Sequence, residues 1–248
     1  MALRPHHVIV YTAVGAPEAG SLSDAGLVEG SPNIHRGQGT ANRRFFFESG
    51  FLELLWVHDE SMAQSTHIAP TKLWDRWAER GRAASPFGLC FSSADGADSL
   101  AFPFWAYRPD YLPDGHCMLF ADSLPLLEPE VFVLNWPQVQ SAPKSEPTKH
   151  PLGLLEMRAV SVGLPFPTSI SSSLRAITDT GLLKVHHSVT PELVIEFTSQ
   201  NDVQHSFPAL GLSIVGRQAA PPNKSLERTP EDKVPSPSIG ARAAQLNR

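Results

Sequence analysis

The sequence has no long hydrophobic run. Across its 248 residues, no apolar stretch approaches the roughly 20 residues that a membrane-spanning helix needs. The opening residues, MALRPHHVIVYT, contain only a short apolar run and no long hydrophobic region before a small-residue cleavage site. We therefore expect a cytoplasmic protein without a signal peptide and without a membrane partner.

Cysteine and charge are also scarce. Cys90 and Cys117 are too few for a disulfide scaffold or a cysteine zinc site, so buried free thiols are expected. Charged residues make up 18% of the chain, and the net charge is −5, from 20 basic and 25 acidic residues. Without clustered Lys and Arg, this balance argues against nucleic acid as a partner. No P-loop, HExxH motif or Ser-His-Asp arrangement is present.

The most informative stretch runs from His35 to Val57. Its aromatic and branched residues predict strands over 41–48 and 51–57, joined by a hairpin turn at Ser49-Gly50. Alternation along the second strand places Glu53 on an otherwise apolar face, with Phe51, Leu55 and Val57. Burying an unpaired carboxylate costs several kcal/mol, so Glu53 needs a partner.

Residues before this stretch complete a first unit. A strand is predicted over 6–12, with His7, Ile9 and Tyr11 on one face, followed by a helix over 17–25 and a short edge strand over 27–29. The expected order is therefore strand, helix, strand, strand, strand.

Further elements follow Val57. The pattern predicts helices over 69–80 and 168–178, and strands over 87–92, 116–120, 131–136, 154–162, 181–188 and 192–198. A polar connector with prolines separates the two groups of strands at 138–149. From Arg217 onward the chain is rich in proline and lacks apolar periodicity, which predicts a disordered tail.

A weak internal repeat is also present. LELLW at 52–56 and LVIEF at 193–197 each place a glutamate, Glu53 or Glu196, inside an apolar strand that ends a similar unit. Two such units side by side would enclose a concave cup able to hold a small molecule.

These residues carry a family resemblance. HHVIV, GQGTANRRFFF and FLELLWV, and less specifically HPLGLLEMRAV at 150–160, resemble the glyoxalase-like branch of the vicinal oxygen chelate superfamily. The resemblance implies an α+β fold of paired βαβββ modules forming a cupped mixed β-sheet. It places a module pair in 1–137 and an additional strand-helix-strand segment that completes the domain in 150–216. The linker in 138–149 and the tail in 217–248 follow from composition.

The resemblance also implies a divalent metal ion in the cup. The matching positions are His7 on the first strand and Glu53 on the strand that ends the module. The second module departs from the pattern under either assignment of its strands. If its first and last strands are 87–92 and 131–136, the candidates at the ligand positions are Gly88, Cys90 or Ser92 on the first and Leu134 or Asn135 on the last. If they are 154–162 and 192–198, the candidates are Glu156 or Arg158 on the first and Glu196 on the last. Neither set completes an octahedral site.

Several candidates have a structural alternative. His7 and Glu53 form a pair of metal ligands, an acid/base couple or a hydrogen-bonded structural pair. His35 and Asn42 match the family pattern for ligand binding, although Asn42 could instead bond its neighbour's backbone. Arg43 and Arg44 alternate across the strand, so one of them, Arg44 in our hypothesis, faces the ligand, unless it pairs with a glutamate.

Other histidines are weaker candidates. His116 and Cys117 are adjacent on a strand, so their side chains point to opposite faces and cannot easily act together. One of His186 and His187 could face the cup, but an isolated strand histidine is more often structural.

The leading functional hypothesis is a glyoxalase-like small-molecule enzyme with lyase, isomerase or dioxygenase chemistry, with or without a divalent metal. In it, Glu53 or Glu196 moves a proton. The alternatives are a binding protein of the same fold that sequesters a small molecule without turnover, and a structural dimer of modules with an emptied site. The expected partner is a small-molecule ligand. The sequence is also compatible with a homodimer.

Overall fold

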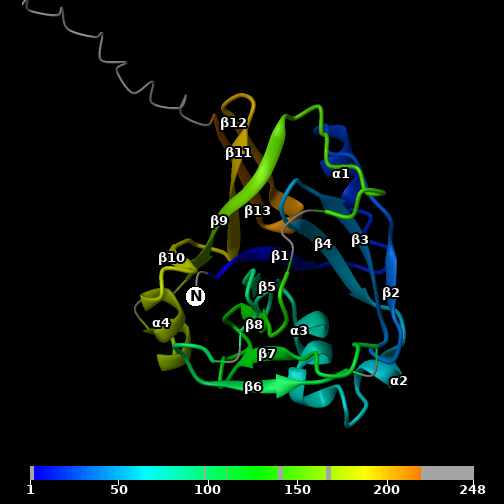
Figure 1. Ribbon diagram of the computed structural model, residues 1–248, viewed down its shortest axis with the longest axis vertical. Helices are drawn as coiled ribbons and strands as arrows, with labels where there is room; N and C mark the ends of the chain where they lie inside the picture. The colour runs from blue at the N-terminus through cyan, green and yellow to red at the C-terminus, as the bar shows by residue number, and fades with distance from the viewer. Residues whose placement is uncertain (1–2, 98, 110, 139–141, 166–168, 219–248) are drawn as a thin grey trace, which may run out of the picture.

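The structure is a computed structural model that describes residues 3–97, 99–109, 111–138, 142–165 and 169–218 (Figure 1). Its larger sheet has eight strands in the order β2-β3-β4-β1-β5-β8-β7-β6. These strands are β1 (Arg4–Tyr11), β2 (Asn33–His35), β3 (Thr40–Phe46), β4 (Phe51–Val57), β5 (Phe87–Ser92), β6 (Phe104–Tyr107), β7 (Met118–Ala121) and β8 (Glu130–Leu134).

Two similar modules meet at the centre of this sheet. β1 pairs in parallel with β4, and β5 pairs in parallel with β8, while β1 and β5 pair with each other in antiparallel orientation. Helix α1 (Ala19–Asp24) follows β1 in the first module, and the described residues between β5 and β6 form no helix. The predicted fold class, an α+β protein built on βαβββ-like modules in a mixed sheet, is confirmed.

A second sheet contains the later strands. It has five strands in the order β10-β9-β11-β13-β12: β9 (Leu154–Leu164), β10 (Lys184–His187), β11 (Glu192–Ser199), β12 (Val203–Phe207) and β13 (Leu212–Gln218). Helix α4 (Ser172–Asp179) precedes β10, and the 3-10 helix η3 (Pro208–Leu210) precedes β13. The module that pairs with the first is therefore the one beginning at β5, not the one beginning at β9.

The two faces of the eight-stranded sheet are covered differently. Val8, Val10, Leu52 and Leu54 point toward the five-stranded sheet and share one core with its apolar residues. The opposite face carries Ile9, Tyr11, Leu55 and Val57 and packs with residues of the segment between the modules. That segment holds α2 (Glu60–Ala63), the 3-10 helix η1 (Ala69–Thr71) and α3 (Leu73–Ala78), which lie at the end of the molecule away from β12 (Figure 1).

Some element predictions are wrong. The edge strand lies at Asn33–His35 rather than 27–29, because it pairs with β3. The helix predicted over 69–80 is broken at Lys72, which has a left-handed backbone with φ of 57°. Strand β13 continues to Gln218, so the first two residues of the predicted tail belong to a sheet.

The rest of the predicted tail, and part of the predicted connector, lie outside the described residues. Within the part of the chain that the structure describes, no helix is long and apolar enough to cross a membrane.

Candidate functional site

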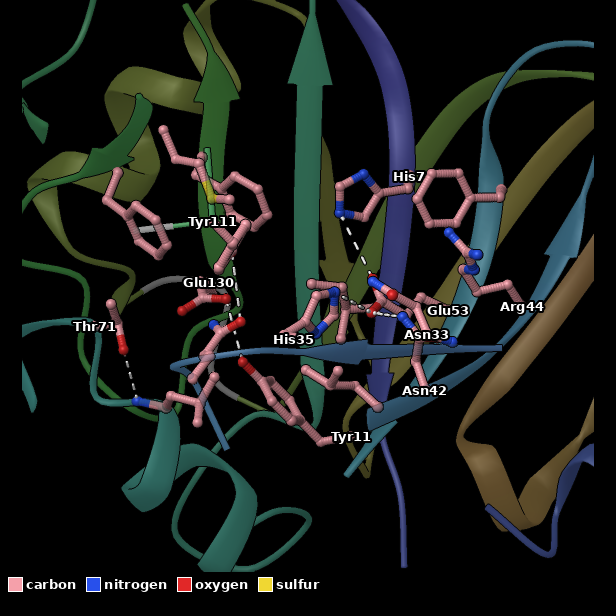
Figure 2. Close-up of a pocket in the computed structure, with 18 residues that line it drawn as sticks. His7, Tyr11, Asn33, His35, Asn42, Arg44, Glu53, Thr71, Tyr111 and Glu130 are labelled. Atoms are coloured by element: carbon pink, nitrogen blue, oxygen red, sulfur yellow. Dashed lines mark hydrogen bonds and ion pairs between the residues drawn. The ribbon is translucent and has the colours of Figure 1, made fainter. Parts of the chain in front are cut away.

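A cavity of about 220 Å³ opens on the face of the eight-stranded sheet that the second sheet leaves uncovered. Period-two alternation aims His7, Ile9 and Tyr11 of β1 into it, because the residues between them point into the core shared with the second sheet. From β4, Glu53 faces the same cavity. Figure 2 shows His7, His35 and Asn42 gathered around Glu53, with Tyr11 and Glu130 on the other side.

Glu53 is a buried carboxylate with one direct hydrogen bond. Its side chain is 5% exposed, and its Oε1 accepts a hydrogen bond of 2.6 Å from Nδ2 of Asn42. The amide of Asn42 is oriented for this because its Oδ1 accepts the backbone N–H of Asn33 at 2.8 Å. No residue that the structure describes donates a hydrogen bond to Oε2 of Glu53, so that atom is available to a ligand.

Two histidines approach the carboxylate without touching it. Nε2 of His7 lies 3.8 Å from Oε2 of Glu53, and Nε2 of His35 lies 3.9 Å from Oε1. Both separations are too long for a hydrogen bond. They leave a gap beside each oxygen in which a ligand atom or a cation could sit between nitrogen and oxygen.

The ring of His7 is held in place by its neighbours. It stacks on Phe51 with ring centroids 4.6 Å apart, and Phe132 meets it edge-on at 5.7 Å. Burial is the main cause that lowers the pKa of His7 well below its usual value, followed by the charges of His6 and His35. His7 is therefore a neutral imidazole at pH 7.

His6 and His7 lie on the same side of β1 although they are adjacent. The pairing of β1 with β5 shifts register between Pro5 and His7, and such a bulge re-aims a side chain. Their Nδ1 atoms are 2.8 Å apart, and together with Sγ of Cys90 they have ligand atoms all within 4.8 Å of one another. This nitrogen and sulfur set suits a borderline or soft metal ion better than Mg²⁺ or Ca²⁺.

The second module contributes Glu130, which sequence analysis missed. Glu130 opens β8, one residue before the predicted strand, and its Oε2 accepts a hydrogen bond of 3.2 Å from the hydroxyl of Tyr11. In register, Glu53 pairs with Ile9, Ile9 with Gly88, and Gly88 with Glu130. The two glutamates thus occupy equivalent positions of the two modules. Burial, the largest cause, raises the pKa of Glu130.

Gly88 makes room for this carboxylate. A Cβ atom at position 88 would lie 3.3 Å from Oε2 of Glu130 and 3.2 Å from the side chain of Ile9. The sequence signal for Glu130 was therefore a strand glycine, which often marks a close approach of another group.

Five predicted site residues meet at this cavity: His7, His35, Asn42, Arg44 and Glu53. Of the two adjacent arginines, Arg44 lines the cavity and its guanidinium lies 4.9 Å from the ring centre of Phe46, whereas Arg43 pairs with Glu29. Arg44 also donates to the backbone oxygen of Ser31 at 2.9 Å.

Glu196 is not brought to this cavity. It lies on β11 in the five-stranded sheet, between Ala159 of β9 and Val215 of β13. The likeness of LVIEF to LELLW placed it in a cup, but its strand belongs to the other sheet. His186, on β10, lies 3.5 Å from Glu192 in the same sheet and is likewise remote from the cavity.

Acidification should destabilise the protein through its buried histidines. Burial lowers the pKa of His6 from 6.5 to about 4, and it also lowers the pKa of His7 and of His150. The unfolded chain therefore binds more protons than the folded chain below pH 6.5, so stability is lost as the pH falls from 6.5 toward 4. Chemical denaturation should show a loss on the order of 2 kcal/mol between pH 7.5 and pH 5.

The control for this prediction is His6→Gln. Without the His6 imidazole, the slope of unfolding free energy against pH should become shallower. The raised pKa of Glu130 acts in the opposite direction, since its contribution to stability is present at low pH and is lost as the pH rises above 4.5. Because Glu130 is present in both proteins, a slope in His6→Gln equal to that of the wild type would contradict the assignment of His6 as a buried neutral group.

Comparisons with known proteins give distant structural similarities. No protein-family model matches the sequence, and no curated protein matches it. A hypothetical protein from Staphylococcus aureus shares 10% identity with a TM-score of 0.47, over 88% of this chain and 100% of that one. A mutant of 4-hydroxymandelate synthase from Streptomyces coelicolor shares 13% identity with a TM-score of 0.35, over 86% of this chain and 62% of that one.

Proposed function

We propose that the protein is a small-molecule enzyme of the glyoxalase-like type that moves a proton with Glu53. The observation that carries this proposal is the state of the Glu53 carboxylate. It is buried, it is oriented by Asn42, and its Oε2 faces the cavity without a hydrogen bond to any described residue. Such a carboxylate has the access and the orientation that a general base needs.

The chemistry that this site supports is an isomerisation at a carbon next to a carbonyl group. On an α-hydroxy carbonyl compound, Glu53 takes the proton from the hydroxyl-bearing carbon through Oε2. The electron pair of the C–H bond forms the C=C bond of an enediolate, and the electron pair of the C=O bond moves to the carbonyl oxygen. The hydroxyl proton then passes to that oxygen while protonated Glu53 returns its proton to the former carbonyl carbon, and the other oxygen becomes the new carbonyl oxygen, so no co-reactant is consumed. On the other side of the cavity, Tyr11 and Glu130 offer polar groups to the substrate oxygens.

The residues around Glu53 fit a divalent metal ion. His7 and Glu53 could hold it between Nε2 and Oε2, which lie 3.8 Å apart. An ion there would occupy the oxygen that takes the proton, so metal binding through Oε2 and proton transfer through Oε2 are alternative roles of Glu53. His6 and Cys90 offer a second set of donors to His7. A bound ion would act as a Lewis acid on adjacent oxygens of the substrate.

The alternative function is binding without turnover. The aromatic walls of the cavity, among them Phe51, Tyr111, Phe120 and Phe132, favour an apolar or aromatic compound. In this function the carboxylate and the histidines would only orient the ligand.

Deuterium exchange separates the two functions. The full-length protein, with and without added Zn²⁺ or Mn²⁺, is incubated in D₂O with a panel of small α-hydroxyketones, and carbon-bound deuterium is followed by NMR. We expect catalysed exchange at the carbon next to the carbonyl. A compound that raises the melting temperature by saturable binding but shows neither exchange nor product, with every metal tested, would favour sequestration instead.

A further inference from the structure

A second cavity, of about 230 Å³, lies beside the first between the break that separates η1 from α3 and the loop that follows β7. It shares Thr71, Phe120 and Glu130 with the first cavity, so these residues form a common wall. Arg76, Lys72 and Ser123 line the second cavity and not the first. The proposed function makes no use of this space.

Arg76 is a buried cation with a free donor. Its side chain is 3% exposed, and its Nη1 donates to the backbone oxygens of Glu128 at 2.7 Å and Leu126 at 3.3 Å, which fixes the plane of the guanidinium. Nε is a buried donor that donates to no residue that the structure describes. The nearest carboxylate oxygen, Oε1 of Glu130, is 3.9 Å from Nε, which is beyond hydrogen-bond length.

The backbone around this cavity is strained. Lys72 has φ of 57° and Ser123 has φ of 59°, and these are two of the three non-glycine residues with positive φ in the described chain. Strain of this kind costs on the order of 1–3 kcal/mol at each residue and clusters at ligand sites. Lys72 also lines this cavity, and its ammonium donates to the backbone oxygen of Leu124 at 3.3 Å, but Lys72 is an exposed residue, whereas Arg76 is buried.

We propose that the second cavity is a binding site for the carboxylate of a small organic acid, which Arg76 holds through its Nε and Nη2 edge. A planar carboxylate matches two parallel N–H donors on one edge of a guanidinium. A buried arginine with a donor that has no acceptor carries a cost in free energy, and a bound carboxylate removes that cost.

The composition of the walls disfavours a doubly charged anion. Asp122 and Glu130 both line the cavity, so a phosphate dianion would meet two acidic side chains while finding one buried cation. A carboxylate carries a single charge and needs only the edge that Arg76 presents. Because Glu130 also lines the first cavity, an anion beside Arg76 would make ionisation of Glu130 less favourable and so couple the two cavities.

The test is a titration of the full-length protein with acetate, and separately with inorganic phosphate, at constant ionic strength. Binding is followed by the backbone and indole NMR signals, which include Trp105 in the cavity wall. We expect saturable binding of acetate, weaker binding of phosphate, and at least a tenfold loss of acetate affinity in Arg76→Lys, which keeps the charge but loses the two-donor edge. Arg82→Lys is the matched control, because the Arg82 side chain is 73% exposed, and it should bind acetate as the wild type does.

A second variant keeps the test decisive if Arg76→Lys does not fold. Glu130→Gln leaves Arg76 in place and removes the competing carboxylate, so it should bind acetate several-fold more tightly than the wild type. The absence of saturable acetate binding in both the wild type and Glu130→Gln would overturn the proposal, as would tighter binding of phosphate than of acetate. These readouts do not depend on turnover at Glu53, so the proposed function can fail while this site stands.

Discussion

Glu53→Gln should abolish most of the proposed activity while leaving the fold intact. Glutamine has the same shape, and its side-chain oxygen can still accept the 2.6 Å hydrogen bond from Asn42. It cannot take a proton from carbon, however. We expect the rate of deuterium exchange to fall by about 10²–10⁴-fold, the usual contribution of a positioned general base, with ligand affinity changed by only a few-fold.

The same substitution should make the protein more stable. Glu53 is buried, receives one hydrogen bond from a neutral amide, and stands 3.8 Å from an imidazole that burial keeps neutral. Removing a charge from such a place should raise the free energy of unfolding by about 1 kcal/mol. Glu156→Gln is the control, since the Glu156 side chain is 45% exposed on the second sheet and its loss should change neither property.

Activity and stability together identify the role of Glu53. Lost exchange with raised stability is the signature of a residue kept for function at a cost to the fold. Lost stability in Glu53→Gln would instead mark the carboxylate as a structural partner of the histidines. Exchange that continues at the wild-type rate in the folded variant would remove Glu53 as the base.

Side-chain alternation made part of the site predictable from sequence. Because side chains alternate along a strand, the sequence predicted that His7 on β1 and Glu53 on β4 could face the same side of the sheet. The structure brings both to one cavity. Asn42, Arg44 and His35 follow from the same hairpin, because strands paired through a tight turn have a fixed register. Local pattern and local pairing were sufficient for these residues.

The residues that sequence analysis missed depend on local irregularity or on distant pairing. A bulge in β1 brings His6 to the side of His7, and simple alternation predicts the opposite. Glu130 joins the site through the pairing of β5 with β8, across about 40 residues of connecting chain that gave little pattern to follow. Arg76 lies within the predicted helix over 69–80, whereas the break at Lys72 sets the true start of α3.

Three strands of the second sheet were predicted, over 154–162, 181–188 and 192–198, whereas β12, β13 and the pairing of the strands were not. Similar sequences at Glu53 and Glu196 suggested equivalent modules, yet β11 pairs with β9 and β13 in a sheet of its own. Hydrophobic pattern shows which residues are buried, and both sheets bury the same kinds of residue. It does not show which of two sheets a strand joins, because that depends on contacts between distant parts of the chain.

Of the substitutions considered, Phe47→Ala should cause the largest loss of stability, because Phe47 packs between the two sheets. Its side chain is fully buried directly after β3, its ring centroid lies 4.5 Å from that of Phe197 on β11, and it lies 5.0 Å from the ring of His150. Truncating a buried phenylalanine leaves a cavity between rigid sheets, and we expect a loss of about 3–5 kcal/mol in free energy of unfolding by urea denaturation. Phe104→Ala, at a side chain 36% exposed on the edge strand β6, should cost less than about 1 kcal/mol.

The position of Phe47 also separates stability from function. Its contacts lie on the side of the eight-stranded sheet that faces the second sheet, whereas Glu53 and the first cavity lie on the opposite side. At temperatures where Phe47→Ala remains folded, exchange at Glu53 and acetate binding at Arg76 should therefore match the wild type. A loss below about 1 kcal/mol in the free energy of unfolding of Phe47→Ala would mean that the two sheets move together and fill the space left by the ring. A loss of ligand binding in the folded variant would mean instead that the second sheet holds the first in the curvature that the cavity requires.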